Sequence, residues 1–410
     1  MKKVLASVAL IEIFSKCNRF ARSCALLSLI AVALTTSVAM SGATVMADDV
    51  RSPAYGAVQS VHRMYVGPYT GDESKGIYLY EFDTSDGRLT SKGLAGEAQN
   101  PSFQALHPTR PLLYSVGEMG AGGAVYAFKI DTDTGKLTLL NTVSSVGPGP
   151  CHIAVDQTGQ CVVIANYGGG SVASYAFNDD GSLSEAKSFF QHEGSGPNQQ
   201  RQKGPHAHCA NFSPDNRFVL VNDLGLDKLF VYRVDPKEGT IEPNDPPFAK
   251  LAPGAGPRHL AFHPNGKIVY VINELDSTVT VFDYDAENGK LTEKQTITTL
   301  PEGFDGQNTT AEIFVHPSGK FVYGSNRGHN SIVVYAVDPD SGKLSFVQRE
   351  SSGGDWPRNF VIDPSGRYLL VAHQKSDDII GFEIDQNTGK IKPTGVRAEL
   401  SQPVCITFGD

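Results

Sequence analysis

The chain has 410 residues, of which 35 are Lys or Arg and 44 are Asp or Glu, so its formal net charge is −9. Residues 1–47 hold five basic residues and one acidic residue; without them 30 basic and 43 acidic residues remain, a net charge of −13. That part of the chain has no basic run or stripe, which argues against a nucleic acid as partner. Its length suits one large repeat domain or two ordinary domains.

The first 47 residues differ from the rest. Five basic residues come before the apolar run "CALLSLIAVALTTSVAM", and small residues follow it up to "VMADD". This order is typical of a secretory signal peptide. We therefore predict a signal peptide over 1–47, a linker over 48–61, and a periplasmic or secreted protein that leaves the membrane after cleavage. The alternative is an uncleaved anchor, against which the Thr/Ser/Gly tail of the run argues.

Four cysteines follow the predicted leader, namely Cys151, Cys161, Cys209 and Cys405. An exported protein can form disulfides, but their spacing matches neither a disulfide framework nor a Cys/His metal site. We expect them to be small buried residues in strands, and we expect no metal and no other cofactor.

One turn sequence recurs seven times, in forms such as "DTDTGKL" at 131 and "DPDSGKL" at 338. Its glycines lie 46 to 58 residues apart, and each copy joins two apolar strands. The Asp side chain can bond amides within the turn, and Gly takes the left-handed position that closes it. A calcium loop is the alternative, but the copies lack the Glu ligand that should follow.

A second turn, in forms such as "FHPNGK" and "VHPSGK", recurs six times. Two hairpin turns per repeat give four strands per repeat, the content of a propeller blade. The last strand, 404–409, and the first, 63–69, lack a hairpin partner, and joining them completes a seventh blade. We predict an all-β, seven-bladed β-propeller over 62–410, with four strands per blade. The N- and C-terminal strands share one blade, which removes exposed sheet edges. A pair of β-sandwiches does not explain seven evenly repeated turns.

The repeats bring polar residues together at one mouth of the channel. In a propeller the first strand of each blade lines the channel and the second runs back, so first-strand starts meet second-strand ends. The first-strand starts supply His152, His206, His208, Arg258, His259, Glu312 and Arg358. The second-strand ends supply Glu118, Tyr167, Asp223, Glu274, Arg327 and Gln374.

Some of these charges must pair with one another, because unpaired buried charges are costly. Convergent titratable groups in a concavity nevertheless mark a ligand site. The arginines predict an anionic, oxygen-rich small molecule, because the guanidinium fork matches carboxylate and phosphate. The polar segment 191–204 precedes this face and is either a lid or a surface insertion. Trp356, the single tryptophan, either stacks on a sugar or packs between blades.

Four blocks of the sequence resemble one known family. They are "GPHAHCANFSPDNRFVLVNDLGLDKLFVYRVD", "GPRHLAFHPNGKIVYVINEL", "AEIFVHPSGKFVYGSNRGHNSIVVY" and "PRNFVIDPSGRYLLVAHQKSDDIIGFEID". They resemble the seven-bladed propeller lactonases, which include the bacterial 6-phosphogluconolactonases and are similar to the fungal carboxy-cis,cis-muconate cyclases. The resemblance spans essentially all of 62–410 and implies a lactonase, or a lactone-forming enzyme that runs the same chemistry in reverse.

The resemblance also implies an active site of a histidine, an arginine, a glutamate and a further arginine. By motif these are His208 in "PHAHCANFSPD", Arg258 in "GPRHL", Glu274 in "NEL" and Arg327 in "SNRGHNS". The chain departs from the family pattern in its leader and in His373, where such blocks often have Asn. A sugar lactone or another carboxylated lactone outside the cytoplasm fits the leader better than the family's phosphogluconate substrate.

The sequence thus predicts metal-free hydrolysis of a sugar-type lactone, such as 6-phosphogluconolactone or a gluconolactone, by a monomer. Glu274 is the expected general base, Arg258 stabilises the oxyanion, and His208 protonates the ring oxygen; the roles of His208 and Glu274 are open to reversal. The expected substrate-binding residues are His206, Arg327, Arg358, Asp223, Glu118 and Gln374. The alternative function is an exported, non-catalytic propeller that binds a partner protein or glycan.

Overall fold

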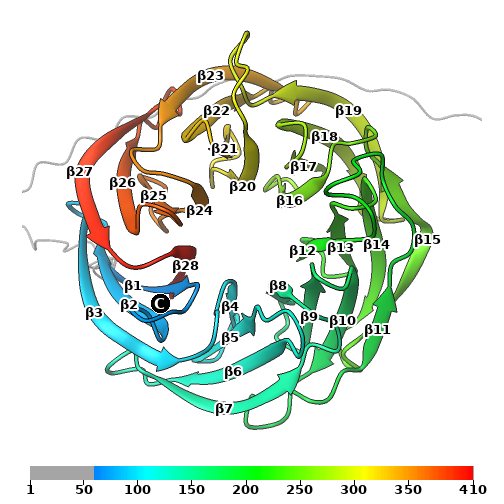
Figure 1. Cartoon of the computed structure of the whole chain (residues 1–410), viewed down its shortest axis with the longest axis vertical. Helices are drawn as coiled ribbons and strands as arrows, with labels where there is room; N and C mark the ends of the chain where they lie inside the picture. The colour runs from blue at the N-terminus through cyan, green and yellow to red at the C-terminus, as the bar shows by residue number, and fades with distance from the viewer. Residues whose placement is uncertain (1–59, 410) are drawn as a thin grey trace, which may run out of the picture. The chain divides into compact units, whose positions relative to one another are not determined.

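The computed structural model describes residues 60–409, and the predicted signal peptide and residues 48–59 lie outside this range. The described part contains 28 β-strands in seven sheets of four, arranged around a central channel (Figure 1). No helix that could cross a membrane is found among residues 60–409. The prediction of an all-β propeller with seven four-stranded blades is confirmed.

The strands are best described by their place in the blade. The innermost strands are β4 (Gln104–Leu106), β8 (Pro150–Val155), β12 (Ala207–Phe212), β16 (Pro257–Phe262), β20 (Thr309–Val315), β24 (Pro357–Ile362) and β28 (Pro403–Gly409). The second strands are β5 (Leu112–Gly117), β9 (Cys161–Asn166), β13 (Phe218–Asp223), β17 (Ile268–Asn273), β21 (Phe321–Arg327), β25 (Tyr368–His373) and β1 (Val61–Pro68).

The two outer strands of each blade complete the sheets. The third strands are β6 (Ala124–Ile130), β10 (Ser171–Ala176), β14 (Lys228–Asp235), β18 (Thr278–Asp285), β22 (Ser331–Val337), β26 (Asp378–Ile384) and β2 (Gly76–Asp83). The outermost strands are β7 (Leu137–Ser144), β11 (Ser188–Gln191), β15 (Thr240–Lys250), β19 (Lys290–Thr298), β23 (Leu344–Ser351), β27 (Ile391–Glu399) and β3 (Arg88–Glu97).

The two ends of the propeller domain meet in the closing blade, whose strand order is β28-β1-β2-β3. Met64 of β1 lies opposite Phe408 of β28, and Val66 lies opposite Ile406. The predicted closure by terminal strands that share one blade is therefore confirmed. Because the ring is closed, every innermost strand is held on the channel at a fixed position.

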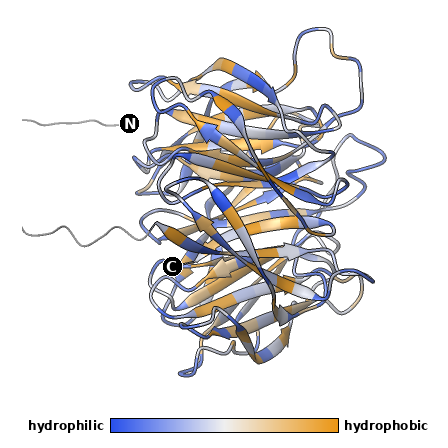
Figure 2. Cartoon of the chain, turned by 90° about the vertical axis from the view of Figure 1, so that its left-hand side faces the viewer, coloured by the Kyte–Doolittle hydropathy of each residue, from blue (hydrophilic) through white to orange (hydrophobic). Residues whose placement is uncertain are grey.

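Burial follows the place of a strand in its blade. The second strand β17, "IVYVIN", is buried along its whole length because both faces of its sheet pack on neighbouring blades. The outermost strand β19 contains only exposed and partly buried residues. Hydrophobic residues accordingly follow the strands, while the connecting loops are hydrophilic (Figure 2). The four cysteines are unpaired and buried in strands, as expected.

The repeated Asp/Gly turn has the predicted geometry. In the copy after β6, Gly135 has a φ of +72°, and its amide donates to the Asp131 carbonyl at 2.8 Å. The Asp131 carboxylate accepts hydrogen bonds from the amides of Asp133 and Thr134. The turn is thus closed by hydrogen bonds from its own backbone amides to Asp131.

These turns also join neighbouring blades. A buried tyrosine hydroxyl on a second strand donates to the carbonyl of the turn glycine in the next blade. The four pairs are Tyr65–Gly135, Tyr114–Gly181, Tyr270–Gly342 and Tyr323–Gly389, at 2.8 to 3.0 Å. In β5, β17 and β21 this tyrosine is the third residue of the strand.

Replacing Tyr270 by phenylalanine is expected to lower the free energy of unfolding by about 1 kcal/mol, because the Gly342 carbonyl loses its donor. Urea unfolding monitored by circular dichroism measures this change. The matched control is Tyr126→Phe, since the hydroxyl of this half-buried tyrosine makes no hydrogen bond within residues 60–409. Equal stabilities for the two variants would contradict the prediction.

Candidate active site

The inner and second strands of each blade meet at one end of the channel. Pro257, at the start of β16, pairs with Asn273 at the end of β17, and Pro357 of β24 pairs with His373 of β25. Glu274 follows β17 directly, so it lies beside the start of β16. This register brings the predicted residues of different blades to the same mouth.

Six of the seven innermost strands, all except β4, have a register shift against the second strand near their start. Four of these shifts fall at residues that lie at the mouth. The strand register shifts around Cys151 in β8, His208 in β12, Arg258 in β16 and Arg358 in β24. A bulge adds one residue against the partner strand and redirects a side chain. Consecutive residues such as Arg258 and His259 can therefore both face the channel, which regular alternation would forbid.

A cavity of about 540 Å³ opens at this mouth. Its wall consists of Tyr69, Glu118, Cys151, Tyr167, Arg201, His208, Glu274, Thr309, Arg327, Trp356, Arg358, Gln374 and Lys375. Four of these side chains are cationic and two are carboxylates, so the wall has an excess of positive charge although the whole chain is acidic.

Glu274 is the centre of an ion cluster formed with Arg201 and Arg327 of this wall and with Arg258, which is buried and does not line the cavity. Oε2 of the glutamate lies 3.2 Å from Arg258 Nε and 2.8 Å from Arg327 Nη2, while its Oε1 lies 2.6 Å from Arg201 Nη2. Burial alone would raise the pKa of the Glu274 carboxyl, but Arg327, Arg258 and Arg201 together lower it to about 2. Glu274 is therefore an ionised partner of three arginines.

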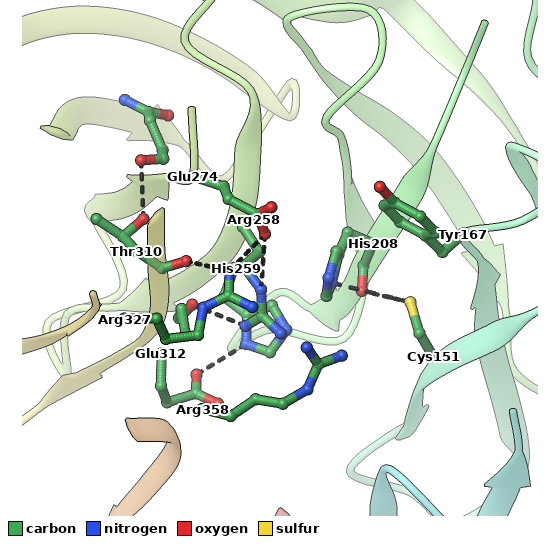
Figure 3. Close-up of polar contacts among 12 residues, drawn as sticks. Cys151, Tyr167, His208, Arg258, His259, Glu274, Thr310, Glu312, Arg327 and Arg358 are labelled. Atoms are coloured by element: carbon green, nitrogen blue, oxygen red, sulfur yellow. Dashed lines mark hydrogen bonds and ion pairs between the residues drawn. The ribbon is translucent and has the colours of Figure 1, made fainter. Parts of the chain in front are cut away.

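The two buried arginines of the cluster are fixed on their other side by backbone carbonyls. Arg258 Nη1 donates to the Ala311 carbonyl at 2.8 Å, and Arg327 Nη2 donates to the Thr310 carbonyl at 2.6 Å. Figure 3 shows both guanidinium groups gathered below Glu274, with His208, Tyr167 and Cys151 across from them. The carboxylate and these carbonyls hold the two guanidinium groups in place without any ligand.

The Glu274 pKa predicts how stability depends on pH. Because the folded value, about 2, lies below the ordinary 4.5, the ion cluster stabilises the fold above pH 4.5, and this contribution is lost as the pH falls toward 2. We expect the difference in unfolding free energy between the wild type and Glu274→Gln to shrink across this window. Urea titrations between pH 5.5 and 2.5 measure it, and a constant difference would contradict the prediction.

His208 is buried on the opposite side of the cavity and faces the arginines. Burial, followed by the charge of Arg258 and the neighbouring His259, places the pKa of His208 well below its usual value, so the imidazole is neutral at pH 7. Its Nδ1 lies 3.8 Å from the Cys151 thiol. Its Nε2 makes no hydrogen bond to any described residue, so this nitrogen is available to a water molecule or a substrate.

A second polar chain crosses the wall at Arg358. Its Nη2 donates to the Tyr69 hydroxyl at 2.8 Å, and this hydroxyl donates to Glu118 Oε2 at 2.8 Å. Lys375 lies over the ring of Trp356, with Nζ 3.4 Å from the ring centroid. Within residues 60–409 neither Arg358 nor Lys375 has a carboxylate partner, so both cations remain available to an anion.

Three of the predicted mouth residues lie one layer deeper in the channel. His259 Nδ1 is 2.8 Å from Glu312 Oε1, and the His152 ring lies edge-to-face with the His259 ring, with centroids 5.3 Å apart. Burial raises the pKa of Glu312 and lowers that of His259 and His152 well below the usual value. These residues line a separate channel cavity of about 540 Å³, whose remaining wall is largely apolar.

Two residues predicted to bind substrate do not line the mouth cavity. The carboxylate of Asp223 is fully buried and accepts hydrogen bonds from His192 Nδ1 and from the amides of His206 and Gly225. The His206 ring stacks behind Tyr167, with centroids 4.5 Å apart. Neither residue is therefore a direct ligand of this cavity: Asp223 is engaged by His192 and two backbone amides, and His206 packs on Tyr167.

The cavity wall also includes residues that the sequence analysis did not propose as ligands. Tyr69 follows β1, which is the second strand of the closing blade, so the rule used for the other six blades would have found it. Arg201 comes from the segment 191–204, and Lys375 follows Gln374. Trp356 lies on the wall, in accord with one of its two proposed roles. No residue pattern indicates that Arg201 reaches Glu274.

Comparison with known proteins gives a consistent answer. The chain is 41% identical over 299 residues to the 6-phosphogluconolactonase of Bacillus subtilis (strain 168). This alignment covers 73% of this chain and 84% of the relative. It is 35% identical over 308 residues to the 6-phosphogluconolactonase of Formosa agariphila, and this alignment covers 73% of this chain and 86% of the relative. Among solved structures, the periplasmic gluconolactonase of Pseudomonas aeruginosa is 34% identical, covers 85% of this chain and 99% of its own, and gives a TM-score of 0.81.

The protein is a seven-bladed propeller with a cavity at one end of its channel, and titratable side chains line this cavity. This arrangement is typical of propeller enzymes that act on small molecules. Residues 63–408 match the family model described as "Lactonase, 7-bladed beta-propeller". The chain belongs to this family and is a hydrolase of the lactonase class. The resemblance drawn from the four sequence blocks is confirmed.

Proposed function

We propose that the protein hydrolyses a sugar lactone of the 6-phosphogluconolactone or gluconolactone type in the cavity lined by His208, Glu274 and Arg358, and that it does so outside the cytoplasm. The observation that carries this proposal is the excess of cations around the neutral His208. Arg358 and Lys375 have no carboxylate partner among the described residues, which suits an anionic, oxygen-rich substrate. The names of the relatives support the substrate class, and the leader together with the periplasmic relative supports the location.

The proposed general base is His208. The sequence favoured Glu274 as base but left the roles of these two residues open to reversal. A general base needs a lone pair that is free to take the proton and lies within reach of the substrate. A carboxylate with a pKa of about 2 binds protons weakly, and all its partners are arginines. His208 is neutral with a free Nε2, and an anionic substrate offsets the positive charges that help to lower its pKa.

In the proposed reaction His208 Nε2 takes a proton from water while the water oxygen bonds to the lactone carbonyl carbon. Arg258 and Arg327, fixed by Glu274, stabilise the negative charge on the carbonyl oxygen. The carbon–oxygen bond of the ring then breaks, and His208 returns its proton to the ring oxygen. The product is a hydroxy acid, whose carboxylate the arginines also bind. Trp356 also lines the cavity, and its ring carries Lys375, with Nζ 3.4 Å from the ring centroid.

A pH-stat assay with a panel of lactones tests the proposal, because hydrolysis releases one acid group per turnover. The panel comprises glucono-δ-lactone, its 6-phosphate and a carboxymuconolactone. We expect hydrolysis of a gluconolactone well above the spontaneous rate. A folded protein that accelerates none of the three would refute the proposed activity.

A further inference from the structure

The segment between β11 and β12 is longer than the corresponding connections of the other blades. It spans residues 192–206, whereas the connections before β8 and β16 span only 145–149 and 251–256. Arg201 of this segment lines the mouth cavity, although it belongs to none of the strands of the blades. Arg201 is the only cation of the Glu274 cluster that no propeller strand carries.

The segment is firmly anchored next to Arg201. Gln202 is fully buried, and its Nε2 donates to the Leu224 carbonyl at 2.8 Å and to Asp227 Oδ1 at 2.7 Å. Its Oε1 accepts a hydrogen bond from the Asn198 amide, and Asn198 Oδ1 accepts one from the Arg201 amide. The backbone at Arg201 therefore has a defined position, and only the side chain has room to change partners.

Arg201 differs from the other two arginines in exposure. Its side chain is 37% exposed, whereas those of Arg258 and Arg327 are 3% and 5% exposed. It lies on the solvent side of the cavity, so it faces the part of a substrate that lies away from the buried arginines.

Arg201 is also the easiest of the three to release from Glu274. Arg258 and Arg327 share Oε2, and Arg201 alone holds Oε1, so Glu274 keeps two ion pairs when Arg201 leaves. The second contact of Arg201 Nη2 is the Tyr167 hydroxyl at 3.1 Å. Its Nε and Nη1 make no hydrogen bond to any described residue. These donors are therefore free for an incoming anion.

We infer that Arg201 is a specificity-determining residue, which binds an anionic group that a sugar lactone carries away from its ring carbonyl and so selects phosphorylated over neutral lactones. This inference rests on the proposed lactonase function. A guanidinium binds phosphate through two charge-assisted hydrogen bonds, and such bonds are about twice as strong as neutral ones. A neutral gluconolactone has no group that competes with Glu274 for Arg201.

The first test compares kcat/KM for 6-phosphoglucono-δ-lactone and for glucono-δ-lactone in the wild type and in Arg201→Gln. We expect the value for the phosphorylated lactone to fall at least about tenfold and that for the neutral lactone to change less than about threefold. Arg201→Lys should recover part of the loss. The matched control is Lys203→Gln, an exposed cation of the same segment that does not line the cavity. Equal changes for both lactones, or none for either, would overturn the inference.

The second test measures binding of 6-phosphogluconate by isothermal titration calorimetry and needs no turnover. We expect Arg201→Gln to weaken binding at least about tenfold and Lys203→Gln to leave it unchanged. Equal affinity in Arg201→Gln and the wild type would refute the anion contact. If the wild type hydrolyses neither lactone, the proposed function fails, and this titration still decides whether Arg201 binds the anion.

Discussion

Replacing His208 by asparagine is expected to lower kcat for lactone hydrolysis at least about a hundredfold, the usual contribution of a positioned general base. Asparagine keeps a polar side chain of similar reach but cannot take a proton. KM should change little, because the arginines that bind the substrate remain fixed by Glu274 and by backbone carbonyls. Steady-state kinetics on the best lactone of the panel measures both constants.

The control for this variant is His206→Asn. His206 lies two residues away and packs behind Tyr167 without lining the cavity, so its replacement should leave kcat within about threefold. A folded His208→Asn protein with near-normal kcat would contradict the assignment of His208 as base. In that case Glu274 would again be the leading carboxylate for this role.

Replacing Glu274 by glutamine is expected to lower kcat/KM at least about a hundredfold and also to lower the melting temperature. Arg258 and Arg327 would lose their shared carboxylate while remaining buried, and breaking a buried ion pair costs about 3–5 kcal/mol. The arginines would then no longer be aligned toward the carbonyl oxygen. Kinetics and thermal unfolding on the same preparation measure the two effects.

Glu118→Gln is the matched carboxylate control. Glu118 lines the same cavity, but its carboxylate accepts a hydrogen bond from Tyr69 and pairs with no arginine among residues 60–409. We expect a smaller loss of both activity and stability than for Glu274→Gln. If the two variants lose activity and stability to the same extent, the proposed role of Glu274 in aligning the arginines is wrong.

The fold could be predicted because the turn sequences of the propeller repeat can be recognised directly in the amino-acid sequence. Seven turns of the "DTDTG" kind, each with a glycine such as Gly135 in a left-handed conformation, mark the hairpins directly. The absence of a hairpin partner for the first and last strands then required the closing blade. The hydrogen bonds from tyrosines such as Tyr270 to the next blade's turn were not predicted, because they join different blades across 66 to 72 residues, beyond the hairpins that the turn sequences mark.

The site could be predicted only to the level of the channel mouth. A strand end locates a residue along the channel axis, but the bulges at His208 and Arg258 decide which side chains face the cavity. A proline directly precedes the bulge in β8, β16 and β24, but this proline was not interpreted as a bulge signal. For this reason His259 and Glu312 lie one layer deeper than expected, and Asp223 lies outside the wall.

A crystal structure of the protein soaked with 6-phosphogluconate tests the central claim most directly, namely that the mouth cavity is the site of lactone hydrolysis. We predict that the product carboxylate contacts Arg258 and Arg327, with His208 Nε2 within hydrogen-bond distance of the hydroxyl released from the ring. The phosphate should contact Arg201. Product bound in the deeper channel cavity beside Glu312, or an empty mouth cavity at saturating product, would contradict the account.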